Sequence, residues 1–510
     1  MQWLNSIVDE LLVRHTQGSI VVSSGVSPSG TYHLGTLREV LTAEVIAEEV
    51  RRRGREARHL HIVDDLDVFR KVPANVPAEW EQYLGRPLCD VPAPDGSERS
   101  YADYYLADLF DAIQKMHLEI EVVRAHERYR AGEYVGVIET ALENVQVIKN
   151  VLTEVSGREL EENWTPIQVV ENGIIKNRLY KNIDKASKTV TFIDSNGDEA
   201  IASYADGHVK LSWRVDWPAR WSMLGVQAEP FGRDHATKGG SYDTGARIVR
   251  EVFGAEPPYP VPYHFINRVG ETKKMSKSAG NVITAAELLT ILPPEIVWFF
   301  LLRSAPDKQL FFGEGETLLR LFDDFAALLA KPDKTEADTQ LIDLCTRNIP
   351  ELVVSNVPFS HLVSTYQASL KDVDLTLRTI ERSEYAETAR EQANIIRREL
   401  AYIDNWLKRW APDEMKFELK EQIEKDLFNE NEVKLFSLLA QKTAEAPADA
   451  DGEYFHLALY SLKDEVGMQP KEMFSALYSL LIGKSSGPRA GWFLSILPRD
   501  WLVARLRLEK

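Results

Sequence analysis

Two stretches of the sequence carry residue types suited to binding a polyphosphate. In "SPSGTYHLGTLREV" (27–40), a Pro-Ser-Gly-Thr turn leads into a helical pattern with His33 and Gly35 at its start. In "GETKKMSKSAGN" (270–281), three lysines crowd into a loop rich in glycine and serine. Lysine supplies compact charge, and serine and backbone amides supply hydrogen bonds, so this composition suits a phosphate clamp. Taken alone, each stretch also fits a plainer interpretation: close helix–sheet packing for the first and a solvated loop for the second.

The elements around the first stretch form a pattern typical of a parallel sheet. "SIVVSSG" (19–25) predicts a buried strand, "TLREVLTAEVIAEEVRRRG" (36–54) predicts a helix, and "RHLHIV" (58–63) predicts a second strand. Strand, turn, helix and strand make a βαβ unit, in which ligands bind at the carboxyl ends of the strands. We therefore expect His33 and the aspartates of "DDLD" (64–67) at that edge.

The remaining pattern predicts further parts of the chain. We expect a mixed α/β insertion at about 85–225, with a β-hairpin at Asn196-Gly197, before the parallel pattern resumes with "EPFGRDHATKGGSYDTG" and "PVPYHFINRVG". The later part of the chain is almost entirely helical in pattern. The expected fold is an α/β Rossmann-type parallel-sheet domain at 1–290, a helical connector at 291–335 and an all-α domain at 336–510.

The composition narrows the class of protein. A chain of 510 residues with 44% hydrophobic and 27% charged residues is typical of a globular protein of two or three domains. Two cysteines, Cys89 and Cys345, exclude a disulfide framework and a four-cysteine zinc site, and they suit a reducing cytoplasm. The first residues favour an amphipathic helix over a signal peptide, and we expect no membrane partner. A net charge of -18 does not exclude nucleic acid, because phosphate is met by local basic patches.

In this order, His33-Leu34-Gly35-Thr36 and Lys274-Met275-Ser276-Lys277-Ser278 resemble the two signatures of class I aminoacyl-tRNA synthetases. The segments "DDLDVFRKVP", "KLSWRVDWPARW", "EPFGRDHATKGGSYDTG" and "LLIGKSSGPRAGWFLSIL" extend the resemblance to the lysyl-tRNA synthetases of class I, from residue 19 to the C-terminus. Thr36 departs from the first signature, whose last position is more often His or Asn. The resemblance implies activation of L-lysine with ATP to lysyl-adenylate, and transfer to tRNA(Lys) with release of AMP.

The resemblance also implies the site residues. It implies catalytic roles for His33, Lys274 and Lys277. It implies ATP binding by Pro28, Ser29, His33, Gly35, Thr36, Lys274, Met275, Ser276, Lys277 and Ser278. It implies a lysine pocket formed by Gly25, Ser27, Asp65, Trp213, His235 and Tyr263. In the lysine pocket, Asp65 is expected to hold the α-ammonium. In the ATP site, Gly35 is expected to let the nucleotide lie against the backbone. The group that faces the lysine ε-ammonium stays open, with Asp216 and Asp234 as candidates.

The expected cofactors are ATP and the Mg²⁺ that accompanies it, since the sequence offers no metal-binding cluster of Asp, His or Cys. Many archaeal members of the family carry a cysteine zinc module in the insertion. Here "KTVTFIDSNGDEAIASYADGHVKL" has no cysteine, so we expect a small β-hairpin module without structural zinc.

The resemblance implies that residues 291–335 contact the tRNA stem and that 336–510 form a helical anticodon-binding domain, in a protein expected to be monomeric. Lys484, Arg489 and Trp492 offer phosphate contacts and base stacking, although an ordinary helix connection fits them equally well. Two alternatives stay open: another class I activity such as glutamate charging, and a non-catalytic or specialised paralogue. A glutamate pocket would need paired arginines, whereas a lysine pocket needs an acidic group.

Overall fold

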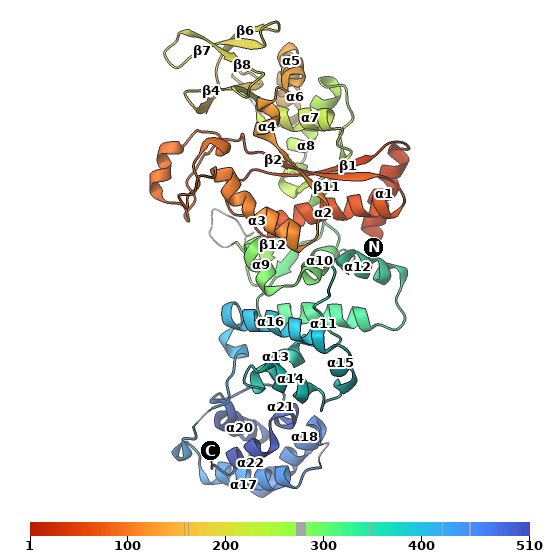
Figure 1. Ribbon diagram of the computed structural model, residues 1–510, viewed down its shortest axis with the longest axis vertical. Helices are drawn as coiled ribbons and strands as arrows, with labels where there is room; N and C mark the ends of the chain where they lie inside the picture. The colour runs from red at the N-terminus through yellow and green to blue at the C-terminus, as the bar shows by residue number, and fades with distance from the viewer. Residues whose placement is uncertain are drawn as a thin grey trace. The chain divides into compact units, whose positions relative to one another are not determined.

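The computed structural model describes residues 1–157, 159–161, 163–271, 282–346, 349–420, 422–447 and 450–509. The chain divides into two compact units (Figure 1). The first unit consists of Met1–Leu289, Val297–Phe312 and Glu336–Ile349, and the second of Thr290–Ile296, Gly313–Thr335 and Pro350–Lys510. These units differ from the expected boundary at 336, because helix α12 (Glu336–Thr346) belongs to the first unit.

Five parallel strands form the central sheet of the first unit, in the order β11-β10-β1-β2-β3. These strands are β1 (Ile20–Val26), β2 (Ala57–Val63), β3 (Ile120–Arg124), β10 (Ala228–Gly232) and β11 (Tyr259–Tyr263). The chain runs outward from β1 through β2 to β3, and later returns to the other side of β1. The strand order therefore reverses between β1 and β10, and ligands of such sheets bind outside the carboxyl ends at this point. The expected Rossmann-type sheet is confirmed.

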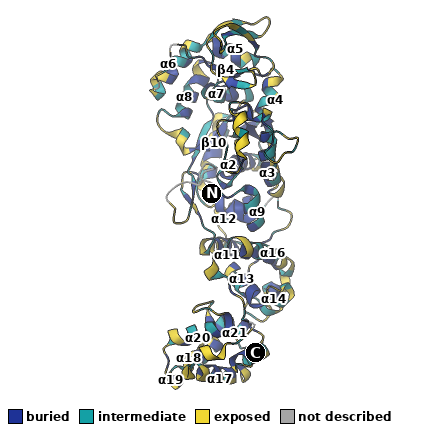
Figure 2. Cartoon of the chain, turned by 90° about the vertical axis from the view of Figure 1, so that its left-hand side faces the viewer, coloured by how far each residue is buried: buried dark blue, intermediate teal, exposed yellow. Residues whose placement is uncertain are grey.

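Helices cover both faces of this sheet. Helix α2 (Leu34–Arg52) joins β1 to β2, and its Glu44 carboxylate lies 2.8 Å from Nδ1 of His59 on β2. Helices α7 (Trp213–Leu224) and α8 (Ser241–Glu251) cover the opposite face. Side chains alternate between the two faces of a strand, so the neighbours of His59 on β2 point toward these helices. Their shared apolar cluster contains Val21, Leu60, Ile62, Val123, Trp221, Val226 and Val249. Every residue of β10 is buried between these layers (Figure 2).

The remaining helices of the first part of the chain surround this core. They are α1 (Gln2–Arg14), α3 (Tyr101–Lys115), α4 (Ala125–Arg130), α5 (Val135–Glu143), α6 (Val145–Ser156), α9 (Ala285–Ile291) and α10 (Pro294–Leu302). The predicted amphipathic N-terminal helix is α1, which buries Leu4, Ile7, Val8 and Leu11. Among the described residues, no single helix combines the length and apolar character needed to cross a membrane. The pair α9 and α10, bent by 109°, passes that test by length and composition only.

The inserted segment is shorter than the expected 85–225. Strand β3 lies inside that range but pairs with β2, so it belongs to the central sheet. After β3 the chain forms two small antiparallel sheets, in the orders β5-β4-β9 and β6-β7-β8. Their strands are β4 (Ile167–Glu171), β5 (Ile174–Lys176), β6 (Tyr180–Asp184), β7 (Thr189–Ile193), β8 (Glu199–Ser203) and β9 (Val209–Leu211). The hairpin predicted at Asn196-Gly197 is confirmed: β7 and β8 pair around it, and Gly197 has a φ of 91°.

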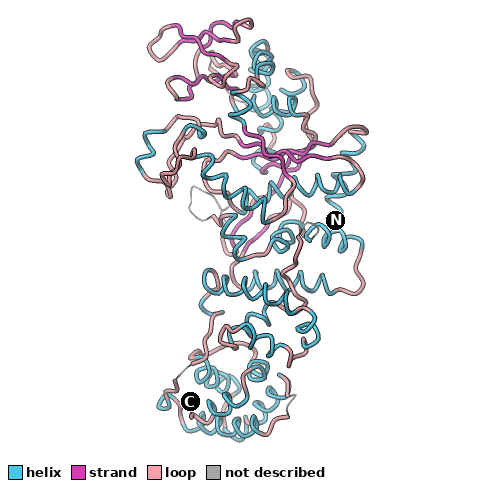
Figure 3. The backbone as a smooth tube through the Cα atoms, in the orientation of Figure 1, coloured by secondary structure: helices cyan, strands magenta, loops and turns pink. Residues whose placement is uncertain are grey.

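A further two-stranded parallel sheet follows β11 in the chain. It pairs β12 (Ile266–Arg268) with β13 (Leu310–Phe312). The second unit contains only helices and loops among its described residues (Figure 3), which confirms the expected all-α C-terminal part. Its helices are α11 (Glu316–Ala330), α13 (Phe359–Ala368), α14 (Val373–Ile380), α15 (Ala386–Glu391), α16 (Ala393–Arg409), α17 (Glu430–Ala444), α18 (Gly452–Ser461), α19 (Lys463–Val466), α20 (Pro470–Ile482), α21 (Ala490–Ile496) and α22 (Arg499–Leu506).

Candidate active site

The central sheet brings most of the candidate residues to one edge. Because all five strands are parallel, the segments that follow them meet at the carboxyl edge. The segment after β1 carries Ser27, Pro28 and Ser29, that after β2 carries Asp64, Asp65 and Asp67, and that after β10 carries Arg233, Asp234 and His235. Tyr263 is the last residue of β11, and helix α2 begins at Leu34 beside the same edge. Pro28 is buried, whereas Ser29 is exposed and its carbonyl accepts a hydrogen bond from the Tyr101 hydroxyl (3.2 Å).

His33 caps the N-terminus of α2. Its Nδ1 accepts hydrogen bonds from the backbone N–H groups of Gly35 (3.0 Å) and Thr36 (3.3 Å). A neutral imidazole that accepts at Nδ1 carries its proton on Nε2, so the ring offers a donor there. A donor at the positive end of a helix suits a phosphate oxygen.

The structure shows what a side chain at position 35 would meet. A Cβ at Gly35 would lie 2.8 Å from Cε1 of His33. The missing side chain therefore makes room for the imidazole of the same motif. Thr36 is largely buried in the first turn of α2, where its backbone N–H also lies 2.9 Å from the carbonyl of His33.

The second signature stretch lies outside the described residues. These undescribed candidates are Lys274, Met275, Ser276, Lys277 and Ser278. The chain that follows them is bonded to the start of α2. The N–H of Leu34 donates to the carbonyl of Ile283 (3.0 Å), the N–H of Ala285 donates to the carbonyl of Tyr32 (2.9 Å), and His33 and Thr284 form a β-bridge.

This pairing brings two regions that are 250 residues apart in sequence into direct contact. Helix α9 follows directly, and the hydroxyl of Thr284 accepts from the N–H of Glu287 at its start (2.9 Å).

A carboxylate that the sequence reasoning missed lies within the predicted lysine pocket. Glu39 on α2 accepts a hydrogen bond from the hydroxyl of Tyr263 (2.5 Å) and another from the N–H of Gly25 (2.8 Å). Glu39 is only partly exposed, and desolvation raises its pKa to about 7. Burial, followed by the nearby Glu39 charge, raises the pKa of Tyr263, so this hydroxyl keeps its proton as a donor. Two predicted pocket residues thus converge on one reachable acidic group.

Asp65 lies at the predicted edge, after β2, and is held there by partners from other elements. Its side chain is fully buried, accepts from Nε of Arg124 (2.5 Å) and from the N–H of His126 (2.8 Å), and lies 2.7 Å from Nδ1 of that histidine. These contacts tie the end of β2 to the end of β3 and enclose the carboxylate within the protein. The contact of Asp65 with a substrate ammonium stays a prediction. Asp67, two residues later, accepts from the guanidinium of Arg70 (2.7 Å), and its Oδ2 lies 3.4 Å from Oγ of the predicted pocket residue Ser27.

Asp216, one of two candidates for the ε-ammonium partner, belongs to a buried charge network. Its carboxylate accepts from the hydroxyl of Tyr129 (2.9 Å) and pairs with Arg220. The same guanidinium lies 3.1 Å from Asp64. Arg220 lowers the pKa of Asp64 against the effect of burial, whereas burial raises the pKa of Asp216. This network fixes α7 against the end of β2 and leaves Asp216 no access to a ligand. The other candidate, Asp234, is exposed at the carboxyl edge.

Aromatic residues of α7 flank His235. The rings of Trp213 and Trp217 lie 6.1 and 5.6 Å from the His235 ring, both edge-on. Trp213 is 39% exposed, so it is not an ordinary core residue. Trp217, which the sequence reasoning did not select, donates its Nε1–H to Glu229 of β10 (3.1 Å). The sequence did contain a signal for Trp217: it lies four residues after Trp213, so the two side chains lie on the same face of a helix.

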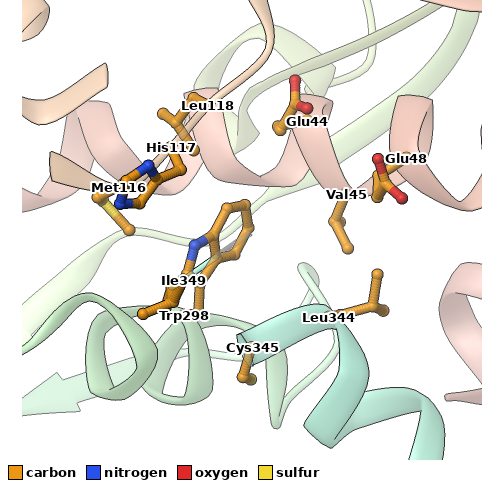
Figure 4. Close-up of a pocket in the computed structure, with 10 residues that line it drawn as sticks. All are labelled: Glu44, Val45, Glu48, Met116, His117, Leu118, Trp298, Leu344, Cys345 and Ile349. Atoms are coloured by element: carbon orange, nitrogen blue, oxygen red, sulfur yellow. The ribbon is translucent and has the colours of Figure 1, made fainter. Parts of the chain in front are cut away.

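The pocket in Figure 4 lies away from this edge. It is lined by Glu44, Val45, Glu48, Met116, His117, Leu118, Trp298, Leu344, Cys345 and Ile349. Residues 116–118 immediately precede β3, so this pocket is on the amino-terminal side of that strand. In the part of the chain that the structure describes, no group of three or more His, Cys, Asp or Glu side chains is placed to hold a metal ion.

The three tRNA-contact candidates in the second unit differ in their surroundings. The Lys484 ammonium donates to the carbonyls of Asp413 (2.6 Å) and Lys416 (2.5 Å), so it braces the unit's own backbone. Trp492 packs edge-on against His361, with 4.7 Å between the ring centroids. Arg489 is exposed.

Comparisons with known proteins show the family of this chain. The family model described as tRNA synthetases class I (K) matches residues 1–346. "Lysine--tRNA ligase 1" of Methanosarcina acetivorans is 36% identical over 99% of this chain and 98% of its own length. "Lysine--tRNA ligase" of Archaeoglobus fulgidus is 36% identical over 99% of each chain. A glutamate tRNA ligase structure from Elizabethkingia meningosepticum covers 96% of this chain and 98% of its own, at 11% identity and a TM-score of 0.44. By the extent of the family match and the identity of these full-length relatives, the chain belongs to the class I (K) family of tRNA synthetases.

Proposed function

We propose that this chain is a lysine–tRNA ligase, which activates L-lysine with ATP and transfers the lysyl group to tRNA(Lys). The observation that carries the proposal is the Glu39 carboxylate, partly exposed and bonded to Tyr263 and Gly25 at the carboxyl edge of the sheet. A desolvated carboxylate attracts an ammonium and repels a second carboxylate, so it favours lysine over glutamate. Two curated relatives that match along nearly the whole chain are named lysine–tRNA ligases.

In the first step, a carboxylate oxygen of lysine attacks the α-phosphorus of ATP, and the bond to the β-phosphate bridging oxygen breaks to release pyrophosphate. This displacement needs charge stabilisation rather than a protein nucleophile. The Nε2–H of His33 and the N-terminus of α2 would hold phosphate oxygens, together with Lys274 and Lys277. Mg²⁺ bound with ATP would neutralise charge on the phosphates.

In the second step, a ribose hydroxyl of the 3′-terminal nucleotide of tRNA attacks the lysyl carbonyl and loses its proton. AMP leaves with the electrons of the broken anhydride bond. Lysine stays in place through both steps. We assign its ε-ammonium to Glu39 and the hydroxyl of Tyr263, and its α-ammonium to the carboxylates that follow β2, with Asp65 and the Arg70-paired Asp67 as the candidates. Trp213, whose ring is steeply inclined to that of His235, would line the four-carbon stem.

We further propose that the second unit binds the anticodon arm of tRNA(Lys) and that residues 291–335 contact the stem. A helical unit with its own apolar core and an exposed Arg489 supports this assignment. Lys484 is a weaker candidate for a phosphate contact because its ammonium is bonded to backbone carbonyls. Two free cysteines suit a cytoplasmic protein, and we propose that it acts as a monomer.

ATP–pyrophosphate exchange tests the proposal directly. The wild-type protein is assayed with each standard amino acid, with and without total tRNA, and Glu39→Gln serves as the matched variant. We expect exchange with lysine and a strongly raised KM for lysine in Glu39→Gln. Exchange with glutamate instead would overturn the substrate assignment, and no exchange under either condition would favour a binding paralogue and make Thr36 the first residue to test.

A further inference from the structure

Arg38 is a buried cation whose partners are backbone carbonyls from two distant segments. It lies on α2, next to Glu39, and is 1% exposed. Its guanidinium donates to the carbonyls of His264, Phe265 (3.5 Å), Pro306 (2.9 Å) and Lys308 (2.8 Å). Burial lowers the pKa of Arg38 to about 10, so it stays charged at neutral pH. Such a costly burial persists only where the charge is well solvated by the protein.

These four carbonyls mark a junction between two sheets. His264 and Phe265 connect β11 of the central sheet to β12, and residues 306–308 lead into β13, which pairs with β12. The N–H of His264 also donates to the carbonyl of Pro306 (2.9 Å). Arg38 therefore fastens the start of both strands of the small sheet to α2.

The same helix carries His33 at its N-terminus, while the chain after β12 enters the second signature stretch at Gly270. Arg38 is thus the side chain that links the element holding the first signature to the strand that precedes the second. Tyr263 has independent support, because the β10–β11 ladder pairs it with Gly232. Loss of Arg38 should therefore move the start of β12 while leaving Tyr263 near Glu39.

We propose that Arg38 is a positioning residue for amino-acid activation: it fixes the start of β12 relative to the N-terminus of α2 and so sets the geometry of the ATP site. This inference rests on the proposed function. A guanidinium fork reaches four carbonyls at once, whereas an ammonium has three donors at a single point and a shorter reach. Misplacement of reacting groups by about 1 Å costs on the order of 100-fold in rate, even when the altered residue touches no substrate.

The test compares Arg38→Lys and Arg38→Met with the wild type in lysine-dependent ATP–pyrophosphate exchange. Active sites are titrated by the burst of lysyl-adenylate, so that kcat is expressed per competent site. We expect kcat to fall about 10- to 100-fold while KM for lysine changes less than about threefold. Arg55→Met is the matched control, since Arg55 also donates to three carbonyls, those of His15, Thr16 and Gly18, near the start of β1.

Gln309→Leu gives a second route if the Arg38 variants do not fold. Gln309 is neutral and partly buried, and its Nε2 donates to the carbonyl of Phe265 (2.7 Å) and to Oδ1 of Asn267 (3.1 Å) at the same junction. We expect the same lowered kcat, with a smaller effect. An unchanged kcat per titrated site, with only a lower melting temperature, would overturn the inference, as would a raised KM for lysine at unchanged kcat. If the wild-type protein showed no lysine-dependent exchange, that result would instead contradict the proposed function itself.

Discussion

Lysine binding should depend on pH through Glu39. Desolvation raises the pKa of this carboxyl to about 7, and only the ionised form attracts an ammonium. Roughly a tenth of the free enzyme carries ionised Glu39 at pH 6, against roughly nine-tenths at pH 8. We therefore expect KM for lysine to rise about tenfold from pH 8 to pH 6.

Glu39→Gln keeps the shape of the side chain but removes this titration. Loss of a charge-assisted hydrogen bond costs about 1.5–3 kcal/mol, so KM for lysine at pH 8 should rise about 10- to 150-fold. Its pH dependence should then be flat.

The assay is ATP–pyrophosphate exchange at saturating ATP between pH 6 and 8.5, with KM for ATP as the internal reference. A flat profile in the wild type, or an unchanged slope in Glu39→Gln, would refute the assignment of Glu39 to the ε-ammonium.

Three further predictions follow from the described contacts. His33→Ala should lower kcat of the exchange about 100- to 1,000-fold with little change in lysine affinity measured by calorimetry; a near-normal kcat would exclude a contact with the reacting phosphate. Asp216→Asn should lower the free energy of unfolding in urea by about 3 kcal/mol, because it breaks a buried ion pair. The KM for lysine should stay unchanged. A raised KM would show that Asp216 contributes to the lysine pocket. Burial raises the pKa of both Glu39 and Glu229 from 4.5 to about 7, so the folded state holds these protons more tightly than the unfolded chain does. The free energy of unfolding of the unliganded protein should therefore fall as pH rises from about 5 to above 7, by up to about 3 kcal/mol per carboxyl. Thermal melts at pH 6 and pH 8 would measure this loss, and lysine should restore stability at pH 8.

The order of elements around the first stretch could be predicted from local patterns. The strands at 19–25 and 58–63 and the intervening helix are recognisable because their apolar residues follow the strand and helix periods. Strand β3 was less recognisable, because "IEVVR" is short and carries charges at two of its five positions. The pairing of β3 with β2 depends on contacts more than 50 residues apart in sequence, which local periodicity does not report.

The site was predictable in its residue types but not in its individual contacts. Three aspartates follow β2 within four residues, and their roles are set by partners from other elements: Arg220 for Asp64, and Arg124 for Asp65. Glu39 was missed because a charged residue in a helix is usually solvated, and the partner that makes it distinctive, Tyr263, is 224 residues away. The sequence does not reveal which acid faces inward until the sheet has brought these residues together.

The position of the inserted segment has a consequence for how this chain can change. Strand β3 lies at an outer edge of the sheet, and β10 lies on the far side of β1, so the connection between them must cross the sheet whatever its length. Added residues in such a connection break no ladder, and each doubling of a flexible connection costs only about 0.6 kcal/mol in closure entropy. The turns of the sheet β6-β7-β8 can therefore change in length while the catalytic edge keeps its register, whereas β9 is tied to that edge because Lys210 donates to the carbonyl of Leu66 (3.1 Å). Surveys of sequence variation should find length changes concentrated in the turns between β6 and β8, and variants with those turns altered should retain lysine activation.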